Sequence, residues 1–512
     1  MSAALKLPVP DDVEPAIMSG KESLLHVLTC GSVDDGKSTL LGRLLFDSHA
    51  VLDDQLTTLD ADSRRFGTQG QGRDFALLVD GLSAEREQGI TIDVAYRYFS
   101  TGRRAFIVAD TPGHEQYTRN MATGASTAEL AIILVDARKG ILPQTRRHSY
   151  IVSMLGVRHV VLAVNKMDLV GFDPAVYHRI ADDYRQAVAG LGFSAVVPVP
   201  ICARAGDNIA SRSARTPWFD GPVLLDYLET VSVTPPEDAD QSFRFPVQWV
   251  NRPSLDFRGY AGSVASGVMY AHQPVVILPG GQPTRIAQIV TADGPLPRAV
   301  AGQAVTVTLG DEIDVSRGDV IVPAGDLLTA SDTVTARLLW MVEAPLSAGQ
   351  NLLIKLGNAT ANARLVRLHH AVDIHSFATR PATNLAMNEI GVAELAFDKP
   401  LVTAAYAANR ELGALVLIDR MTNRTVALGV VEAAVVQTRQ PVPEPANAEE
   451  RVRFWQTMAN RFLTASALYA IVVALSHDVV LAAIVALAEV ALRPILSRLL
   501  KSAWKMSVAG NG

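Results

Sequence analysis

Apolar and polar positions in the first half of the chain follow a pattern that predicts strands alternating with helices. Apolar-rich or alternating runs occupy residues 24–30, 94–99, 105–109, 130–135, 160–164 and 196–201, and residues 39–46, 145–155 and 223–230 have helical spacing. Uninterrupted apolar runs are typical of strands buried on both faces. The succession therefore predicts a doubly wound, mostly parallel α/β sheet. The polar stretch 49–88 predicts a mobile insertion.

The second half changes to short β-rich runs separated by glycine-containing turns. Six such runs fall between residues 241 and 325, and five more between 326 and 440. This spacing predicts two β-barrel domains, 241–325 and 326–440. We also expect a flexible arm over 1–20, an α/β domain over 21–232, and a linker rich in proline and acidic residues over 233–240.

The C-terminal region carries two apolar runs of 14 residues, 462–475 and 479–492, which predict a helical hairpin over 451–508. Basic residues at both ends and the flanking Trp455 and Trp504 fit a membrane-facing hairpin. Each run is shorter than the roughly 20 residues that span a bilayer, and Glu489 would be costly in lipid. Two interpretations stand: a membrane contact, which we favour, and a hairpin that docks on protein.

Composition narrows the setting in which the protein works. The formal net charge of −6 argues against a broad basic face, so no nucleic-acid partner is expected. Two cysteines, Cys30 and Cys202, make no disulfide scaffold and indicate a reducing compartment. Residues 1–20 lack the succession of basic, apolar and small residues that is typical of a signal peptide. We therefore predict a cytoplasmic protein, with membrane association through the C-terminal hairpin.

A phosphate-binding motif lies between the first expected strand and the first expected helix. It reads Gly31, Ser32, Val33, Asp34, Asp35, Gly36, Lys37 and Ser38, followed by Thr39. Backbone N–H groups of such a loop and the helix N-terminus attract a polyphosphate. Lys37 is expected to reach the β- and γ-phosphates, and the Ser38 hydroxyl to hold Mg²⁺.

The next expected strand ends at a second motif, formed by Asp110, Thr111, Pro112, Gly113 and His114. Asp110 is placed to complete the Mg²⁺ shell, partly through water, and Thr91 in the preceding loop is placed to join it and contact the γ-phosphate. Gly113 permits a close backbone approach to that phosphate. His114 is placed to orient the attacking water. The predicted catalytic residues are His114 and Lys37.

A third motif, made of Asn165, Lys166, Met167 and Asp168, follows the strand at 160–164. The Asp168 carboxylate can accept from N1–H and the 2-amino group of guanine, a pair that adenine lacks. The Lys166 stem can cover one face of the base. Backbone N–H groups of Cys202, Ala203 and Arg204 are expected to meet the guanine O6. Together the three motifs predict GTP and Mg²⁺ as ligands.

These motifs and the residues next to them resemble those of a known protein family. Residues 31–39, 86–99, 110–121 and 251–262 resemble translational-type GTPases, and more closely the large GTPase subunits of bacterial sulfate adenylyltransferase (ATP sulfurylase). The resemblance covers about residues 20–437. This chain departs from the family at Cys202, where serine is usual, and at Glu129, where aspartate is usual.

The resemblance implies a P-loop GTPase domain over 21–232 that hydrolyses GTP to drive an unfavourable reaction. That reaction forms adenosine 5′-phosphosulfate and diphosphate from ATP and sulfate. It further implies a heteromer with a small catalytic subunit, on which the ATP and sulfate sites mainly lie. Bifunctional relatives add an adenylylsulfate kinase with its own phosphate loop. Because the sequence holds no second such motif, we expect no kinase activity.

Other interpretations remain open at this stage. A translation elongation-type GTPase would carry aminoacyl-tRNA on its barrels, and residues 251–262 favour the sulfurylase subunit over it. A membrane-tethered switch without catalytic output rests on the C-terminal hairpin alone. His369, His370 and His375 could suggest a metal site, although we favour ordinary strand and surface positions because no zinc-ligand spacing accompanies them.

Overall fold

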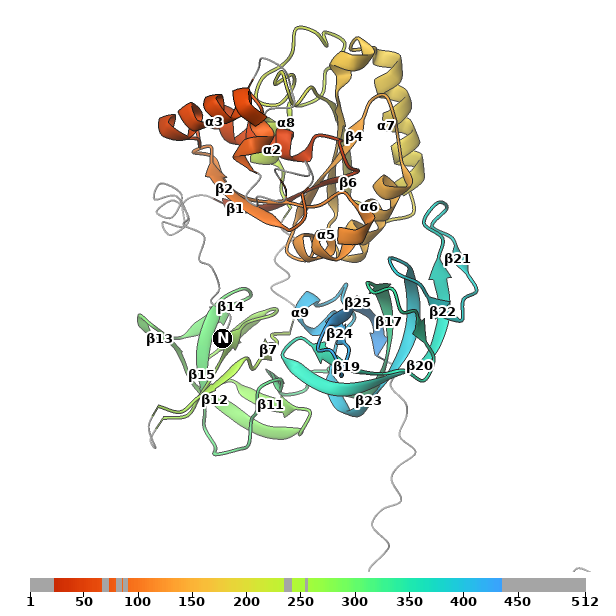
Figure 1. The fold of residues 1–512 in the computed structure, drawn as a ribbon. Helices are drawn as coiled ribbons and strands as arrows, with labels where there is room; N and C mark the ends of the chain where they lie inside the picture. The colour runs from red at the N-terminus through yellow and green to blue at the C-terminus, as the bar shows by residue number, and fades with distance from the viewer. Residues whose placement is uncertain are drawn as a thin grey trace, which may run out of the picture. The chain divides into compact units, whose positions relative to one another are not determined.

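The computed structural model describes residues 23–66, 73–79, 85, 91–233, 242–253 and 257–434. The N-terminal part contains a six-stranded sheet in the order β2–β3–β1–β4–β5–β6, with helices on both sides (Figure 1). Only β2 runs antiparallel to its neighbour β3; the other pairs are parallel. This confirms the predicted doubly wound, mostly parallel sheet. The strands are β1 (Ser23–Gly31), β2 (Ala95–Ser100), β3 (Arg104–Asp110), β4 (Leu130–Asp136), β5 (His159–Asn165) and β6 (Ala195–Pro200).

The central strands are buried from end to end, as their unbroken apolar sequences require. Every residue of β4 is buried, and β1 is buried over its last five residues. Because the parallel strands share one direction, their carboxyl ends open onto the same edge of the sheet. The loops that follow β1, β3, β5 and β6 carry the three predicted motifs and residues 202–204, so the fold gathers them at one edge.

Six helices accompany this sheet in the described residues. They are α2 (Lys37–Asp47), α3 (Asp53–Phe66), α5 (Thr118–Ala125), α6 (Pro143–Met154), α7 (Pro174–Val188) and α8 (Leu224–Thr230). Helix α7 was not predicted from the sequence, although Asp173 and Pro174 are a typical helix start and Asp173 caps the Ala175 N–H at 2.8 Å. The apolar stripe of α7 faces the sheet and is buried.

The expectation of a mobile insertion over residues 49–88 was wrong for its described part. Residues 53–66 form α3, in which Leu56, Leu59 and Ser63 lie on one face at spacings of three and four. The short helix η1 (Phe75–Leu78) packs on α2, where a Cβ on Gly42 would lie 1.9 Å from the Phe75 carbonyl oxygen. Few apolar residues suffice here because they are spaced for a single helix face.

A first antiparallel β-barrel follows the sheet domain. Its strands are β7 (Phe245–Pro246), β8 (Trp249–Asn251), β9 (Gly259–Ser263), β10 (Val268–Tyr270), β11 (Pro274–Leu278), β12 (Gln282–Thr291), β13 (Gly294–Leu296), β14 (Arg298–Val300), β15 (Ala304–Leu309) and β16 (Val320–Pro323). The main path is β7–β16–β11–β12–β15–β9–β8. The path curls back on itself at Gly262 of β9, where a Cβ would lie 2.3 Å from the Pro246 carbonyl oxygen of β7.

The second barrel closes fully, because β19 pairs with both β24 and β20 at the two ends of the path β19–β24–β25–β17–β23–β20. Its elements are β17 (Ala330–Trp340), β18 (Leu346–Ser347), β19 (Asn351–Leu356), β20 (Ala359–Val372), β21 (Thr379–Arg380), β22 (Asn384–Leu385), β23 (Ile390–Val402), α9 (Arg410–Gly413), β24 (Ala414–Ile418) and β25 (Thr425–Ala434). The barrel prediction is thereby confirmed. Strand β25 was not predicted from the sequence.

The arm over 1–20, most of the linker and the hairpin over 451–508 lie outside the described residues, so those expectations stay predictions. Among the residues that the structure does describe, none of the helices has the length and apolar character needed to cross a membrane.

Candidate nucleotide site

The phosphate loop joins β1 to α2 in a tight turn. Gly36 has a φ of 93°, and a Cβ there would lie 2.5 Å from Nδ2 of Asn165, so glycine is the residue that fits. The Lys37 ammonium donates to the carbonyl oxygens of Ser32 at 2.8 Å and Gly31 at 3.3 Å. The lysine therefore lies along the inner side of the loop rather than in solvent.

Lys37 shares a buried patch with two carboxylates. Burial lowers the pKa of Lys37, and the charges of Asp110 and Asp35 oppose that shift. Burial raises the pKa of Asp35, while the Lys37 charge and the Ser32 N–H, 2.6 Å from Oδ2, oppose the rise. A bound polyphosphate would add further negative charge beside Lys37, which favours its ammonium form.

The three predicted magnesium ligands converge on one point beside Lys37. The Ser38 hydroxyl donates to Oδ2 of Asp110 at 2.7 Å and lies 3.3 Å from the Thr91 hydroxyl. Thr29 of β1 donates to Oδ1 of Asp110 at 2.8 Å. Burial raises the pKa of Asp110, and Lys37, Ser38 and Thr29 oppose the rise. One carboxylate with two hydroxyls is an all-oxygen set of the kind that Mg²⁺ accepts when phosphates and waters complete the shell.

Thr29 was not predicted as a site residue. It sits inside an apolar strand, where a threonine is usually a β-propensity residue. Only the parallel register, which pairs Thr29 with Asp110, reveals that its hydroxyl orients the carboxylate. A polar residue near the carboxyl end of a buried strand is the signal that could have identified it.

Gly113 lies directly against the phosphate loop. A Cβ on Gly113 would be 2.6 Å from Nζ of Lys37 and 2.7 Å from the Gly31 carbonyl oxygen. Because no side chain can occupy that space, glycine is required for the second motif to approach the first. The Gly113 backbone thus lies directly beside the Lys37 ammonium and the phosphate loop.

His114 follows Gly113 on an exposed turn. It precedes the short helix η2 (Glu115–Tyr117), and its Nδ1 accepts the Gln116 N–H at 3.3 Å. Its ring lies 6.0 Å from that of Tyr117. Among the described hydrogen bonds, none joins the ring to Lys37, Ser38 or Thr91. The structure therefore places His114 beside the site. The three predicted magnesium ligands, by contrast, lie in contact through the Ser38 hydroxyl.

Asn165 connects the motifs at the end of β5. Its Nδ2 donates to the Asp35 carbonyl oxygen at 2.8 Å, and its Oδ1 accepts the N–H groups of Lys166 at 2.8 Å and Ala203 at 2.9 Å. One buried side chain thus joins the phosphate loop to both segments predicted to bind guanine. The Ala203 N–H, expected to meet the guanine O6, is used inside the protein here.

Lys166 is held in part by Asp136, a residue that none of the sequence motifs includes. Its ammonium donates to the Asp34 carbonyl oxygen and lies 3.1 Å from Oδ2 of Asp136, at the end of β4. Burial alone would raise the pKa of Asp136, but hydrogen bonds from Arg138 and Lys166 lower it overall. The Asp136 carboxylate thus fixes the position of the Lys166 stem, which is the part expected to cover the base.

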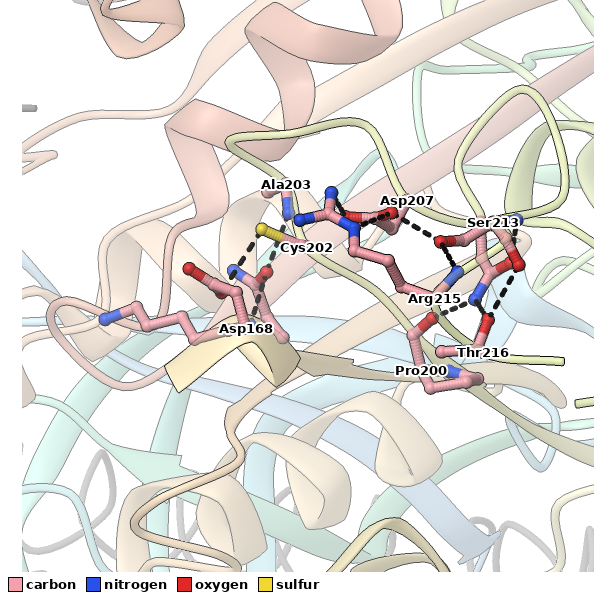
Figure 2. Close-up of polar contacts among 11 residues, drawn as sticks. Asp168, Pro200, Cys202, Ala203, Asp207, Ser213, Arg215 and Thr216 are labelled. Atoms are coloured by element: carbon pink, nitrogen blue, oxygen red, sulfur yellow. Dashed lines mark hydrogen bonds and ion pairs between the residues drawn. The ribbon is translucent and has the colours of Figure 1, made fainter. Parts of the chain in front are cut away.

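Asp168 lies in the short helix η3 (Met167–Val170) with an exposed side chain, opposite the loop after β6. The Cys202 thiol donates to Oδ1 of Asp168 at 3.2 Å (Figure 2). Burial raises the pKa of Cys202 to about 11; the hydrogen bond to Asp168 and the charge of that carboxylate add to the rise, while a backbone hydrogen bond from Ala205 opposes it. The thiol is therefore protonated near neutral pH and serves as a weak donor to this carboxylate.

The remaining predicted residues lie around the same edge of the sheet. Thr111 donates to the Thr29 carbonyl oxygen at 2.7 Å, Thr39, Pro112 and Met167 are buried, Val33 is half-buried, and Arg204 is exposed. The edge thus combines a cationic loop, an all-oxygen cluster and an exposed carboxylate. Such an arrangement can hold a polyphosphate at one end and a base with two adjacent donors at the other.

Comparisons with known proteins identify families that this chain resembles. The model of the Elongation factor Tu GTP binding domain matches residues 22–275, and that of the GTP-eEF1A C-terminal domain-like family matches residues 333–432. The chain is 54% identical over 418 residues to sulfate adenylyltransferase subunit 1 of Citrobacter koseri, covering 81% of this chain and 88% of that protein.

Two further likenesses differ in extent. The bifunctional enzyme NodQ of Rhizobium sp. (strain N33) is 54% identical over 413 residues, which are 80% of this chain and 64% of that protein. A crystal structure of sup35 complexed with GDP is 22% identical, with a TM-score of 0.37, over 81% of this chain and 95% of that chain.

Proposed function

This chain belongs to the sulfate adenylyltransferase subunit 1 family, and from that premise we propose that it is a GTP-hydrolysing subunit that drives sulfate activation. The observation that carries the nucleotide part is the convergence of Ser38, Thr91 and Asp110 beside Lys37. These side chains come from three separate segments, and packing of the apolar core does not require hydroxyls there. The alternative of a tRNA-carrying elongation factor is less well supported, since a sulfate adenylyltransferase subunit 1 is 54% identical to this chain over 418 residues.

The residues divide into a phosphate end and a base end. Lys37 neutralises charge on the β- and γ-phosphates, and the Gly113 N–H faces the γ-phosphate. His114, which is exposed on the turn after Gly113, orients the attacking water. At the base end, Asp168 accepts from guanine N1–H and the 2-amino group, while Asn165 holds the two loops together. Guanine is selected because adenine would leave the carboxylate unpaired.

Mg²⁺ fits the cluster of Ser38, Thr91 and Asp110, and when bound it supplies charge neutralisation on the phosphates. We expect Ser38→Ala to shift the Mg²⁺ concentration that half-saturates GTP hydrolysis upward. Because loss of an outer partner already costs about 10–100-fold in metal affinity, loss of a ligand should cost at least about tenfold. GDP binding measured in EDTA should change little. An unaltered Mg²⁺ titration in the variant would contradict the assignment.

The partner is a small catalytic subunit on which ATP and sulfate mainly bind. Under this proposal, GTP hydrolysis here is coupled to adenosine 5′-phosphosulfate and diphosphate formation there. Coupling requires that the partner change the nucleotide site, because a ligand shifts a reaction only through differential interaction with its states.

The test is the GTP hydrolysis rate of the purified full chain alone, and with the small subunit, ATP and sulfate. We expect turnover to rise, and adenosine 5′-phosphosulfate to appear, only when all three are present. Turnover that ignores them but responds to ribosomes and charged tRNA would retain the GTP site and refute the sulfurylase role. Omission of sulfate alone is the matched control, since the proteins and nucleotides are then unchanged.

A further inference from the structure

A segment beyond the guanine loop, residues 205–219, is tied down by a dense polar network. The Asn208 side chain donates at 2.8 Å to both the Pro200 carbonyl oxygen and the Thr216 hydroxyl (Figure 2). It also accepts the Ser213 N–H at 2.9 Å. Asn208 is 1% exposed, so these bonds are shielded from water. None of these residues belongs to the three nucleotide motifs, yet their network begins immediately after the loop 202–204.

Asp207 and Arg215 form the part of this network nearest to the base site. The Asp207 side chain is 7% exposed and accepts from Nε of Arg215 at 3.0 Å, from its second guanidinium nitrogen, and from the Ser213 hydroxyl at 2.5 Å. This two-point contact fixes the plane of the guanidinium. The backbone of Asp207 pairs with that of Cys202, so Arg215 is attached to the loop that faces Asp168.

The flat face of the Arg215 guanidinium lies against the turn that follows Asp168. Its guanidinium carbon lies 4.8 Å from the centre of the Phe172 ring. Phe172 has a left-handed backbone with φ of 55°, and its N–H donates to the Met167 carbonyl oxygen at 2.8 Å. The Trp218 indole donates to the Phe172 carbonyl oxygen at 3.1 Å. Arg215 thus contacts the segment that carries Asp168 through Phe172, and it is connected to the loop that carries Cys202 through Asp207.

We propose that Arg215 is a positioning residue for guanine recognition, which sets the separation between the 202–204 loop and the turn that carries Asp168. A planar guanidinium can pair with Asp207 at its edge and stack on Phe172 with its face, which the point charge of a lysine cannot do. The contact between the Cys202 thiol and Asp168 is a weak one, so it leaves much of the alignment to this brace.

This inference rests on the GTP site proposed above but not on coupling to sulfate activation. It is tested with the purified full chain alone, by measuring Kd for GDP and for IDP, which lacks the 2-amino group that Asp168 accepts. If Asp168 is displaced, bound GDP loses two hydrogen bonds and bound IDP loses one. Arg215→Ala should therefore raise the Kd for GDP about fivefold. The ratio of the IDP Kd to the GDP Kd should fall by about threefold.

Two further variants separate positioning from general destabilisation. Arg215→Lys keeps the charge and should still lower the GDP preference, because it loses both the fork and the stacking. Phe172→Leu keeps apolar volume, loses the ring face, and should act in the same direction. The matched control is Arg185→Ala, which removes a similarly exposed arginine paired with Asp182 on α7 and should leave the preference unchanged.

The outcomes are distinct. A lowered GDP-to-IDP preference in Arg215→Ala and Arg215→Lys, but not in Arg185→Ala, supports the proposal. An unaltered preference overturns it, whether GDP affinity stays the same or both affinities fall together, because a purely structural role would give either result. If Arg215→Ala does not fold, Arg215→Lys decides by the same criterion. A wild-type chain that does not prefer GDP to IDP or ADP would instead refute the GTP site itself.

Discussion

Replacing Asp168 with asparagine is expected to move the nucleotide preference from guanine to xanthine. The carboxylate can accept two hydrogen bonds, whereas an amide offers one acceptor and one donor, which matches N1–H and the 2-carbonyl oxygen of xanthine. Two hydrogen bonds to a charged group contribute about 3–6 kcal/mol, so GTP affinity should fall roughly 10²–10⁴-fold. XTP affinity should rise, and competition of unlabelled GTP or XTP against a labelled guanine or xanthine nucleotide measures both changes.

The control for this substitution is Asp182→Asn, which makes the same chemical change at an exposed aspartate on α7. It should leave both affinities as in the wild type. Asp168 is suited to the role because its side chain is exposed beside the buried Asn165, and among the described residues the hydrogen bond to its carboxylate comes from a weak donor, the Cys202 thiol. If Asp168→Asn retains the wild-type margin of GTP over XTP, the assignment of this carboxylate to the base is wrong.

The second large effect is expected from His114→Ala, which should slow GTP hydrolysis by roughly 10²–10⁴-fold. GDP affinity should change by less than about threefold, because the ring contacts Gln116 and Tyr117 rather than the phosphate loop. Single-turnover hydrolysis with excess protein separates the chemical step from nucleotide binding. The expected split is a large loss in rate with a nearly unchanged dissociation constant.

His114→Gln tells two roles of the ring apart. A glutamine amide can orient water but cannot serve as a base, so a variant that keeps much of the rate supports orientation. His375→Ala removes an exposed histidine from the second barrel and should leave the rate unchanged. If His114→Ala hydrolyses GTP at the wild-type rate in the presence of the partner, ATP and sulfate, the catalytic assignment fails.

The sheet and the loop positions could be predicted because each depends on local pattern. The unbroken apolar run of β4 identifies a buried central strand, and three motifs at strand ends must meet at one edge of a parallel sheet. Ser38 and Asp110, 72 residues apart in sequence, were expected to share an ion, and their side chains are in contact. Their roles toward GTP and Mg²⁺ stay proposals.

The rest depends on contacts that only the folded chain defines. Thr29 looks like an ordinary strand residue until the register pairs it with Asp110. Asp136 ends a strand in the same way as Asp110, but no motif marks it, and its role follows from the proximity of Lys166. Arg215 lies among turns without periodicity, where its pairing with Asp207 could not be inferred. Helix α3 has few apolar residues, so only their spacing along one face, and not their number, indicates a helix there.

The buried side chain of Asn165 has a consequence for how nucleotide leaves the protein. It bonds at once to the phosphate loop through Asp35 and to the base loops through Lys166 and Ala203. Loosening one end of the site removes a hydrogen bond that supports the other end. We therefore expect the phosphate loop and the base loops to loosen together when nucleotide dissociates.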